Sequence, residues 1–355
     1  MVRVFVRRSR DATYLTSDAA LELDGVRDGA AGWWVRGGGD SANPREVERV
    51  FTSSARSSVV GYDIVVAAPR PISILVALDS SHARGVVSAH RVSVAASIDY
   101  LEERALLLRD RRDGDDRDVP ARWQEILSYT HGVNRHGEPH LHDHVLVGAR
   151  PRDASTVLDG RSLFAHVGTA DALYRSSLRH ELGRRTPWAA WRSFSGVEHV
   201  RDLDEGYRAL WGGHYDERGD KRTWARDEVV AKWLADERRF EPHGVVPSPR
   251  VRASLDEHGF AAAFEGRFDV ARRHVVAAWA DAAVFGQSAR DVVASVDRLY
   301  PGLGAQRGVR ETTISVDRAR MLLRVREHGE RPLLVDDLER WDQRSRGRSR
   351  SDLSR

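Results

Sequence analysis

The sequence predicts an α+β fold, in which helices flank a central antiparallel β-sheet and a mostly helical region follows. Two strand-like runs, 125–130 and 141–147, are separated by a loop of hairpin length that contains Gly137 and Pro139. Such a loop joins antiparallel neighbours, because parallel strands need a crossover of about a dozen residues or more. Strand-like and helix-like runs alternate irregularly before Ser195, which argues against a doubly wound parallel sheet.

The elements at the start of the chain follow from apolar spacing and from the residues that interrupt it. Residues 2–6 are expected to form a short strand. Asp11 and Thr13 then open a helical stretch that Gly25 ends, because short polar residues begin helices and glycine terminates them. A glycine-rich loop is expected around 33–39.

The middle of the chain alternates between strand and helix. Residues 59–66 are expected to form a strand that Pro69 and Pro71 stop, and 81–108 has the apolar spacing of a helix. The charged run 109–118 is expected to be a solvated loop. Beyond the hairpin we expect an extended segment at 157–164 and helices at 166–184, 227–238, 267–285 and 289–299.

The composition indicates a globular protein without a membrane span. The 355 residues are 41% apolar and 31% charged, and no uninterrupted apolar stretch approaches the roughly 18–20 residues that cross a bilayer. The N-terminus lacks the apolar core of a secretory signal, and the absence of Cys excludes disulfides and thiolate nucleophiles. These features favour a cytoplasmic location.

The charge pattern is dominated by arginine. The net charge is only +3, and Lys221 and Lys232 are the only lysines. The planar guanidinium suits phosphate contacts, but an excess of Arg also follows from a GC-rich genome, so charge alone does not establish a nucleic-acid partner. The run 344–350 has no apolar residue to pack, and it is expected to be disordered and able to hold phosphates non-specifically.

Three histidines around the hairpin carry the strongest chemical signal. His142 and His144 alternate along one strand, so both imidazoles project from the same face. His131 ends the preceding strand and is expected to fold back beside them. Three neutral imidazoles that leave coordination positions open are typical of a metal ion that acts on a substrate. An incidental cluster of surface histidines and a structural zinc site without its fourth ligand are the alternatives.

Four segments of the sequence resemble motifs of the TrwC/TraI-type (MOBF) conjugative relaxases of the HUH endonuclease superfamily, and they occur in the same order as in that family. The resemblance covers roughly residues 1–190, and rests on Tyr14 in the first helix, on 61–70, on the three-histidine motif of 130–144 with spacings of 11 and 2 residues, and on 158–181. It implies an HUH-type palm that nicks one DNA strand at a plasmid origin of transfer and stays covalently attached to the 5′ end. The His motif is the most specific of these segments.

The sequence departs from this family pattern at three points. Tyr14 is the only Tyr before Tyr62, whereas family members often carry two pairs of tyrosines near the N-terminus, which puts in doubt any scheme in which one protomer attacks twice. Arg70 and Pro71 stand where the family usually has Lys-Ser. The helicase half of the longest members is missing, so unwinding would require another protein.

The resemblance implies a metal-dependent transesterification. Tyr14 would be the nucleophile that forms a 5′-phosphotyrosine and frees a 3′-hydroxyl, and its alternative is a half-buried position in an amphipathic helix. One divalent ion, Mg, Mn or Zn, would bind a non-bridging phosphate oxygen and act as Lewis acid. Its ligands would be His131, His142 and His144.

Asp63 is the expected partner of this machinery. It lies in the middle of a strand among apolar neighbours, where a carboxylate is costly without a partner. It is expected to orient a ligand histidine or to accept the proton of the tyrosine, and the orienting role is preferred. A salt bridge to Arg56 or Arg70 is the alternative.

Further side chains are candidates for DNA contact or for structural roles. Trp33 and Trp34 are expected either to stack on bases or to pack in the core. His136 and His140 are interpreted as loop or DNA-facing residues, with His140 turned away from the face of the ligands, and Asp143 as structural. His82, His90 and His166 are expected at surface or capping positions in helices. The residues expected to contact phosphate are Arg70, Arg161, Arg175 and Arg179. For the last three, which follow the strand of His142 and His144, a solvated surface is the alternative.

The expected domains are a relaxase palm at 1–195, a helical region at 196–303 that closes over DNA, and a C-terminal helix with an Arg-rich tail at 304–355. The expected partner is single-stranded or supercoiled DNA at the origin of transfer, with a hairpin; a conjugative coupling protein and a separate helicase are further candidates. The location would be the bacterial cytoplasm, without membrane insertion. Two other functions stay open: a non-catalytic DNA-binding protein of the same fold, and a hydrolytic metal-dependent single-strand nuclease.

Overall fold

The structure is a computed structural model, and the expected helix around Tyr14 and the tail at 344–350 lie outside the residues that it describes. None of the helices in the described part is both long and apolar enough to cross a membrane. The described residues are 1–10, 33–36, 50–51, 58–78, 82–112, 115–134, 136–151, 158–192, 198–200, 226–237, 263–264, 269–300, 303 and 313–315.

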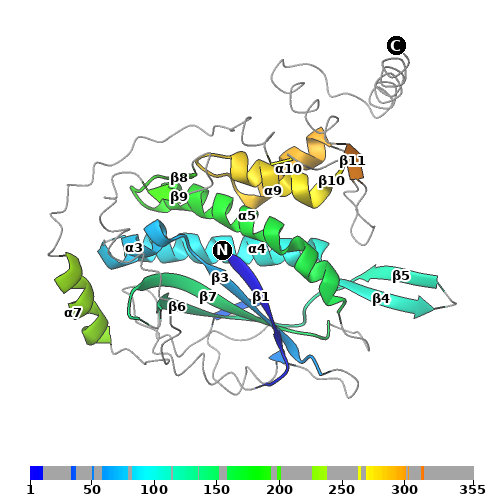
Figure 1. Cartoon of the computed structure of the whole chain (residues 1–355), viewed down its shortest axis with the longest axis horizontal. Coiled ribbons are helices and arrows are strands. Elements are labelled where there is room, and N and C mark those ends of the chain that lie inside the picture. Colours follow the sequence, from blue (N-terminus) through cyan, green and yellow to red (C-terminus); the bar gives the residue numbers. More distant parts are fainter. Residues whose placement is uncertain are drawn as a thin grey trace, which may run out of the picture.

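A five-stranded antiparallel sheet forms the centre of the fold (Figure 1). Its strands lie in the order β1-β3-β7-β6-β2, and every neighbouring pair is antiparallel. Only β6 and β7 are joined by a tight hairpin, as the sequence predicts. The strands are β1 (Val2–Arg7), β2 (Trp33–Arg36), β3 (Gly61–Ala67), β6 (Ile126–Val133) and β7 (Pro139–Gly148).

Helices cover one side of this sheet in two layers (Figure 1). The long helices α4 (Ala83–Arg104) and α5 (Gly160–Arg185) pack against each other, and α9 (Arg272–Ala282) packs on α5 from the far side. The fold class predicted from the sequence is therefore confirmed. The remaining helices are α3 (Arg70–Leu78), which packs on β7, α7 (Arg226–Glu237), which touches α3, and α10 (Ala289–Leu299), which packs on α9.

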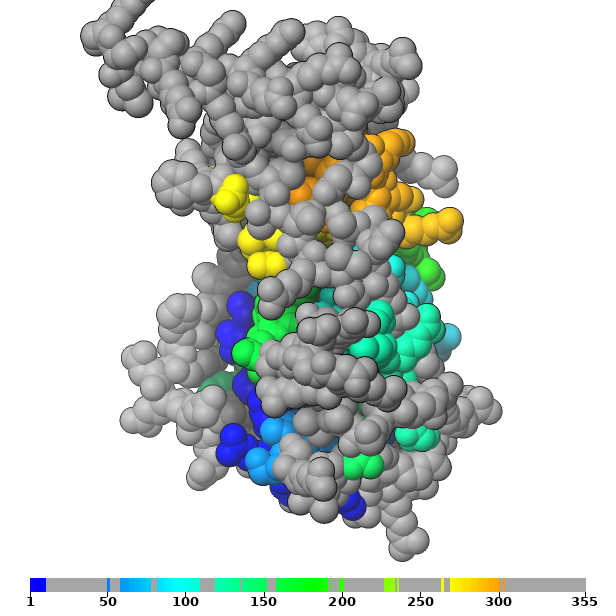
Figure 2. Space-filling view, turned by 90° about the vertical axis from the view of Figure 1, so that its right-hand side faces the viewer, coloured from blue at the N-terminus to red at the C-terminus, as the bar shows by residue number. Residues whose placement is uncertain are grey.

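Three small antiparallel pairs complete the described elements. In the space-filling view, the yellow and orange atoms of residues 269–300 lie above the dark-blue atoms of residues 1–10 (Figure 2). The pairs are β4 (Leu107–Arg112) with β5 (Asp115–Pro120), β8 (Ala190–Arg192) with β9 (Glu198–Val200), and β10 (Asp269–Ala271) with β11 (Thr313–Ser315).

The two faces of the sheet have different surroundings, because successive residues of a strand point to opposite faces. On the helix side, Ile64 and Val145 join the main core that also contains residues of α4 and α5. On the other side, Leu127, Tyr129 and Leu146 join a smaller cluster in which the rings of Tyr129 and Phe51 are both fully buried. The second face carries the histidines.

The start of α5 corrects the extended segment expected at 157–164. The side chain of Asp159 accepts a hydrogen bond from the backbone N–H of Arg161 at 3.0 Å, which caps the first turn of the helix. The helix therefore begins at Gly160, six residues before the predicted start at 166. Pro69 and Pro71 likewise end a strand as predicted, but they also open α3, because the first turn of a helix does not need the missing proline N–H.

The charged run at 109–118 is not a loop but most of the β4–β5 hairpin. The register pairs Arg109 with Asp118 and Asp110 with Arg117. The alternating signs in the sequence therefore match an antiparallel pairing, in which opposite charges directly across from one another are favourable. The loop expected at 33–39 is also wrong at its start, because β2 pairs with β6.

Candidate metal centre

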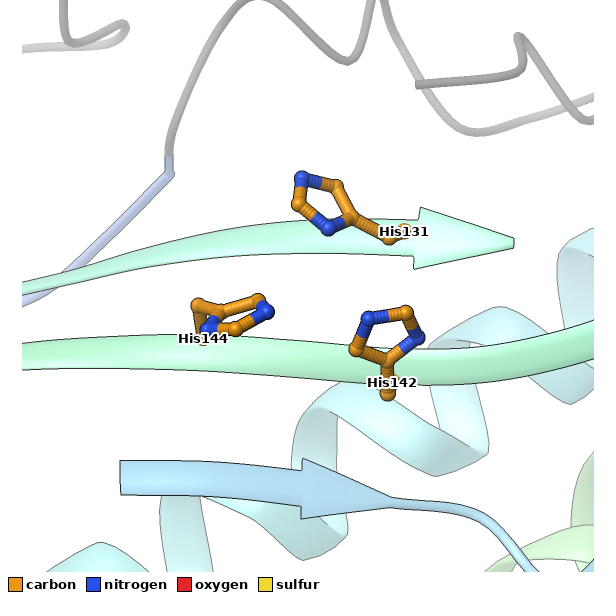
Figure 3. A group of neighbouring side chains, drawn as sticks. All are labelled: His131, His142 and His144. Carbon is orange, nitrogen blue, oxygen red and sulfur yellow. The ribbon is translucent and has the colours of Figure 1, made fainter. Parts of the chain in front are cut away.

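His131, His142 and His144 converge on the face of the sheet opposite α4 and α5. His131 lies directly opposite His142 in the β6–β7 register, and His144 lies two residues further along β7. The ring centroids of the three pairs are 5.2, 5.2 and 5.4 Å apart. Figure 3 shows the three rings gathered over the same side of the two strands. The backbone pairing alone thus brings together side chains that are eleven residues apart.

The spacing of the ligand atoms fits a single divalent cation. One nitrogen from each histidine can be chosen so that all three lie within 4.8 Å of one another. Two nitrogens bound to one zinc ion at about 2.1 Å lie at most about 4.2 Å apart, so small rotations of the rings bring the set into range. Three imidazoles leave further coordination positions for a substrate, and imidazole donors suit Zn, Cu, Fe and Ni.

Hydrogen bonds behind two of the rings leave their Nε2 atoms for the cation. Nδ1 of His144 lies 3.0 and 3.1 Å from the two carboxylate oxygens of Asp63. Nδ1 of His142 lies 2.8 Å from the carbonyl oxygen of His140. A carboxylate and a carbonyl only accept, so each Nδ1 carries the hydrogen and each Nε2 presents its lone pair. Asp63 therefore contacts His144, one of the three candidate ligands, which is the arrangement that the preferred interpretation of the sequence requires.

His140 stands on the ligand face, so the prediction that it turns away is wrong. Residues two apart along a strand share a face, and the rings of His140 and His142 are 4.6 Å apart. Burial and the nearby charge of Arg70 lower the pKa of His140 to about 4. Burial and the neighbouring imidazoles of His140, His131 and His144 hold the pKa of His142 well below its ordinary value. A neutral imidazole is the form that a metal ion binds.

A buried polar cluster lies behind the ligands on the opposite face of β7. Asp143 is fully buried, its Oδ1 lies 3.0 Å from Nε2 of His90, and its Oδ2 accepts from the hydroxyl of Ser128 at 2.7 Å. Nδ1 of His90 lies 2.7 Å from the hydroxyl of Tyr174. Burial raises the pKa of Asp143, but His90 and the two hydrogen bonds outweigh it and leave that pKa below its ordinary value. The cluster ties β6 and β7 to α4 and α5.

The sequence predicts surface or capping positions for the histidines of the helices, but His90 and His166 are buried. His90 has no exposed surface, and His166 is 6% exposed with Nδ1 2.9 Å from the hydroxyl of Tyr100. His82 does occupy the N-cap of α4, although its side chain makes no capping hydrogen bond. Only the mid-strand carboxylate of Asp143 signals in the sequence that a partner such as His90 must exist.

The loop between the ligand strands is held from two directions. Arg70 donates to the carbonyl oxygen of Pro139 at 3.0 Å and to the carboxylate of Glu138 at 3.1 Å. From α7, Nε1 of Trp233 donates to the carbonyl oxygen of Gly137 at 2.8 Å. Gly137 has a positive φ of 70°, a conformation that favours glycine. Arg70 was expected to contact DNA; in this structure its guanidinium positions the ligand loop.

The three arginines after β7 that were expected to contact phosphate have different surroundings. Arg179 has no exposed side-chain surface and donates to Glu198 at 2.6 Å and to two carbonyl oxygens. Arg175 is 13% exposed and pairs with Asp171 and Asp281. Neither guanidinium reaches a phosphate in this arrangement, because carboxylates already occupy them. Arg161 is 74% exposed beside Asp159 at the start of α5, and it stays a candidate for phosphate contact.

Three other expected site residues are Tyr14, Trp33 and Trp34. Tyr14 lies outside the described residues. Trp33 and Trp34 lie in β2, where Trp33 pairs with Ser128 and Trp34 with Leu127. That register puts them on the strand next to β6, which carries His131.

Comparison with known proteins identifies what this arrangement is similar to. The profile of the TrwC relaxase family matches residues 12–211. Solved structures that match include the conjugative relaxase TrwC with mutant oriT DNA (16% identity, TM-score 0.54, covering 68% of this chain and 99% of that one) and the same relaxase with oriT DNA in a metal-bound structure (17%, 0.52, 67% and 98%). A third is TrwC with a 27-mer DNA that comprises the recognition hairpin and the cleavage site (17%, 0.52, 67% and 98%). No curated protein matches the chain significantly.

Proposed function

The chain belongs to the TrwC relaxase family, and from this membership we propose that it nicks one strand of DNA at an origin of transfer by metal-assisted tyrosine transesterification. The observation that carries the proposal is the convergence of His131, His142 and His144, with Asp63 behind His144, on the face of the sheet opposite α4 and α5. A structural zinc site would need a fourth protein ligand. Among the described residues, the group that could hold an ion consists of these three histidines alone.

When bound by the three imidazoles, a divalent cation supplies Lewis acidity toward a non-bridging phosphate oxygen. The chain's own residues do the rest. Asp63 holds His144 in the tautomer that exposes Nε2, and the carbonyl of His140 does the same for His142. The loop contacts of Arg70 fix where β7 begins.

Tyr14 is the proposed nucleophile. Its oxygen forms a bond to phosphorus, the bond from phosphorus to the 3′-oxygen breaks, and the 3′-oxygen leaves as a hydroxyl after taking up a proton. One phosphoester replaces another, so the reaction needs no ATP and can run backward to rejoin the strand. A tyrosine with a pKa near 10 must lose its proton on attack, which requires a nearby base or a stabilised anion.

The proposed substrate is single-stranded or supercoiled DNA that carries a hairpin beside the nick site. This proposal is supported by the similar TrwC structures, which are complexes with oriT DNA and in one case with the recognition hairpin. We also propose that the protein acts in the cytoplasm, that a separate helicase unwinds the strand and that a coupling protein receives the complex.

The test is a covalent adduct between protein and DNA. Radiolabelled single-stranded oligonucleotides that tile the DNA upstream of the gene are incubated with the protein and Mg²⁺, Mn²⁺ or Zn²⁺ and run on a denaturing gel. We expect a labelled protein band with the wild type and with Tyr62→Phe, the next tyrosine along the chain, and none with Tyr14→Phe or after chelation.

Each alternative function gives its own result in this assay. Free 5′-phosphate product without a labelled protein band would make the protein a hydrolytic nuclease in which water attacks. Selective binding of one oligonucleotide without cleavage under any of the three ions would make it a non-catalytic DNA-binding protein. An undiminished adduct with Tyr14→Phe would show that another residue is the nucleophile.

A further inference from the structure

The edge strand β1 presents an aromatic ring on the same face as the histidines. Phe5 lies directly opposite Asp63 in the β1–β3 register, and residues opposite one another project to the same face. Asp63 in turn contacts His144 on β7. Phe5 is nevertheless 49% exposed, so its ring is not part of the core.

The neighbours of Phe5 on this face are cationic. Side chains two apart along a strand share a face, so Arg3 and Arg7 flank Phe5 there. The guanidinium of Arg7 lies 6.0 Å from the ring centroid of Phe51, which belongs to the hydrophobic cluster of that face. This contact confirms that the odd-numbered side chains of β1 point to the histidine face. Val2, by contrast, is buried in the main core on the helix side.

The distance from Phe5 to the histidines is short enough for one extended single strand of DNA to contact both. Neighbouring strands are about 4.8 Å apart, and β3 alone separates β1 from β7, so Phe5 lies roughly 10 Å from the line of the ligands. Atoms of residues 1–10, drawn in dark blue, reach the surface in Figure 2. A bound polymer can therefore cover both places at once.

We propose that Phe5 is a stacking platform for a base of single-stranded DNA beside the metal centre, with Arg3 and Arg7 next to the flanking phosphates. The inference rests on the proposed function, because it takes DNA to be the substrate of this face. An aromatic ring between cations matches the alternation of base and phosphate along a single strand. An apolar protein partner would match the ring but not the cations on either side.

The first experiment measures the affinity of the full chain for a fluorescein-labelled random-sequence single-stranded oligonucleotide by anisotropy. Every base has a π-face, so stacking does not require the nick sequence. Loss of one stacked base costs about 1–3 kcal/mol, which corresponds to roughly 5- to 150-fold in Kd. We expect Phe5→Ala to weaken binding at least fivefold and Phe5→Tyr to bind like the wild type.

The matched control is Val6→Ala, which removes a side chain that is 40% exposed on the opposite face of the same strand. It should leave the Kd unchanged. Equal affinities for Phe5→Ala and Val6→Ala would overturn the proposal, as would the absence of binding by the wild type. Capture of an extended peptide at the edge of β1 instead of DNA would overturn it as well.

A second oligonucleotide of the same length with abasic sites separates stacking from a structural effect. The wild type and Phe5→Ala should bind it equally, because it has no bases to stack. An equal loss on both oligonucleotides would mean that Phe5 supports the strand rather than a base, which contradicts the proposal. Failure of the proposed function is recognised separately, by the absence of the Tyr14 adduct from a wild type that still binds DNA.

Discussion

At the histidine cluster, each ring with a described partner is held by a group that accepts its Nδ1 hydrogen. Asp63 does this for His144 through its carboxylate, and the carbonyl of His140 does it for His142. Charge behind an imidazole raises its basicity toward a metal ion and fixes the orientation of its ring. We therefore expect the affinity for a cation to depend on residues that need not touch it.

Replacement of Asp63 by Asn should weaken metal binding by about 10- to 100-fold, because the amide keeps the shape of the side chain but loses its charge. Isothermal titration of the metal-free protein with Mn²⁺ or Zn²⁺ measures the effect. Asp269→Asn, which neutralises an exposed carboxylate in β10, serves as the control. Equal dissociation constants for the two variants would show that Asp63 does not act through His144.

The low pKa of His140 makes the free energy of unfolding depend on pH. The folded protein binds the proton only below a pH of about 4, whereas the unfolded chain takes it up below its ordinary value of about 6.5. Between these values the unfolded state holds more protons, so the free energy of unfolding falls as the pH falls from about 6.5 to about 4. Urea denaturation of the metal-free protein should show a smaller fall for His140→Gln; parallel pH profiles would contradict this assignment.

At the scale of the elements, the sheet depends on one close approach beside the site. A Cβ on Gly61 would lie 2.4 Å from the ring of Phe51 and 2.4 Å from the carbonyl oxygen of Val147. Phe51 anchors the smaller hydrophobic cluster under the histidine face. The glycine at the start of β3 therefore allows a buried ring to lie directly against the backbone of the sheet.

Gly61→Ala should consequently destabilise the protein by about 1–3 kcal/mol, because neither the ring nor the backbone has room to yield. The free energy of unfolding in urea measures this change. Gly168→Ala in α5 is the matched control: nothing lies within 4 Å of its Cβ position, and alanine should stabilise that helix by up to about 1 kcal/mol. Equal and small effects at both positions would contradict the overpacking argument.

Elements with a clear period were predictable, and those decided by tertiary contacts were not. The strand pair with its histidines follows from alternation and one short loop, and the fold class followed from it. The β4–β5 hairpin was missed because its residues carry no apolar alternation, only alternating charges. His140 was misplaced by an error of register rather than by a missing signal. The buried role of Arg179 depends on Glu198, which no local pattern links to it.

For the molecule as a whole, one buried ion-pair network joins the palm to the elements that follow it. Glu198 of β9 accepts from Arg179 of α5 at 2.6 Å and from Arg192 of β8 at 3.2 Å. Asp281 of α9 pairs with Arg175 at 3.0 Å. The network spans the predicted domain boundary at residue 195, which stays a prediction.

Glu198→Gln should destabilise the protein by about 3–5 kcal/mol, because it leaves buried guanidinium groups without their shared carboxylate. Glu103→Gln is the control, since Glu103 is 58% exposed in its pair with Arg104 and contributes at most about 1 kcal/mol. Urea denaturation compares the two. A difference below about 1 kcal/mol would show that the network is not a principal link between these elements.

The indole of Trp233 bears on how far this protein can be shortened. It belongs to α7, which follows the predicted end of the palm, yet it donates a hydrogen bond to the loop between β6 and β7. A fragment cut after residue 195 would retain all three imidazoles and lose that hydrogen bond. We therefore expect the smallest fragment that binds a cation as the intact chain does to extend at least through residue 233.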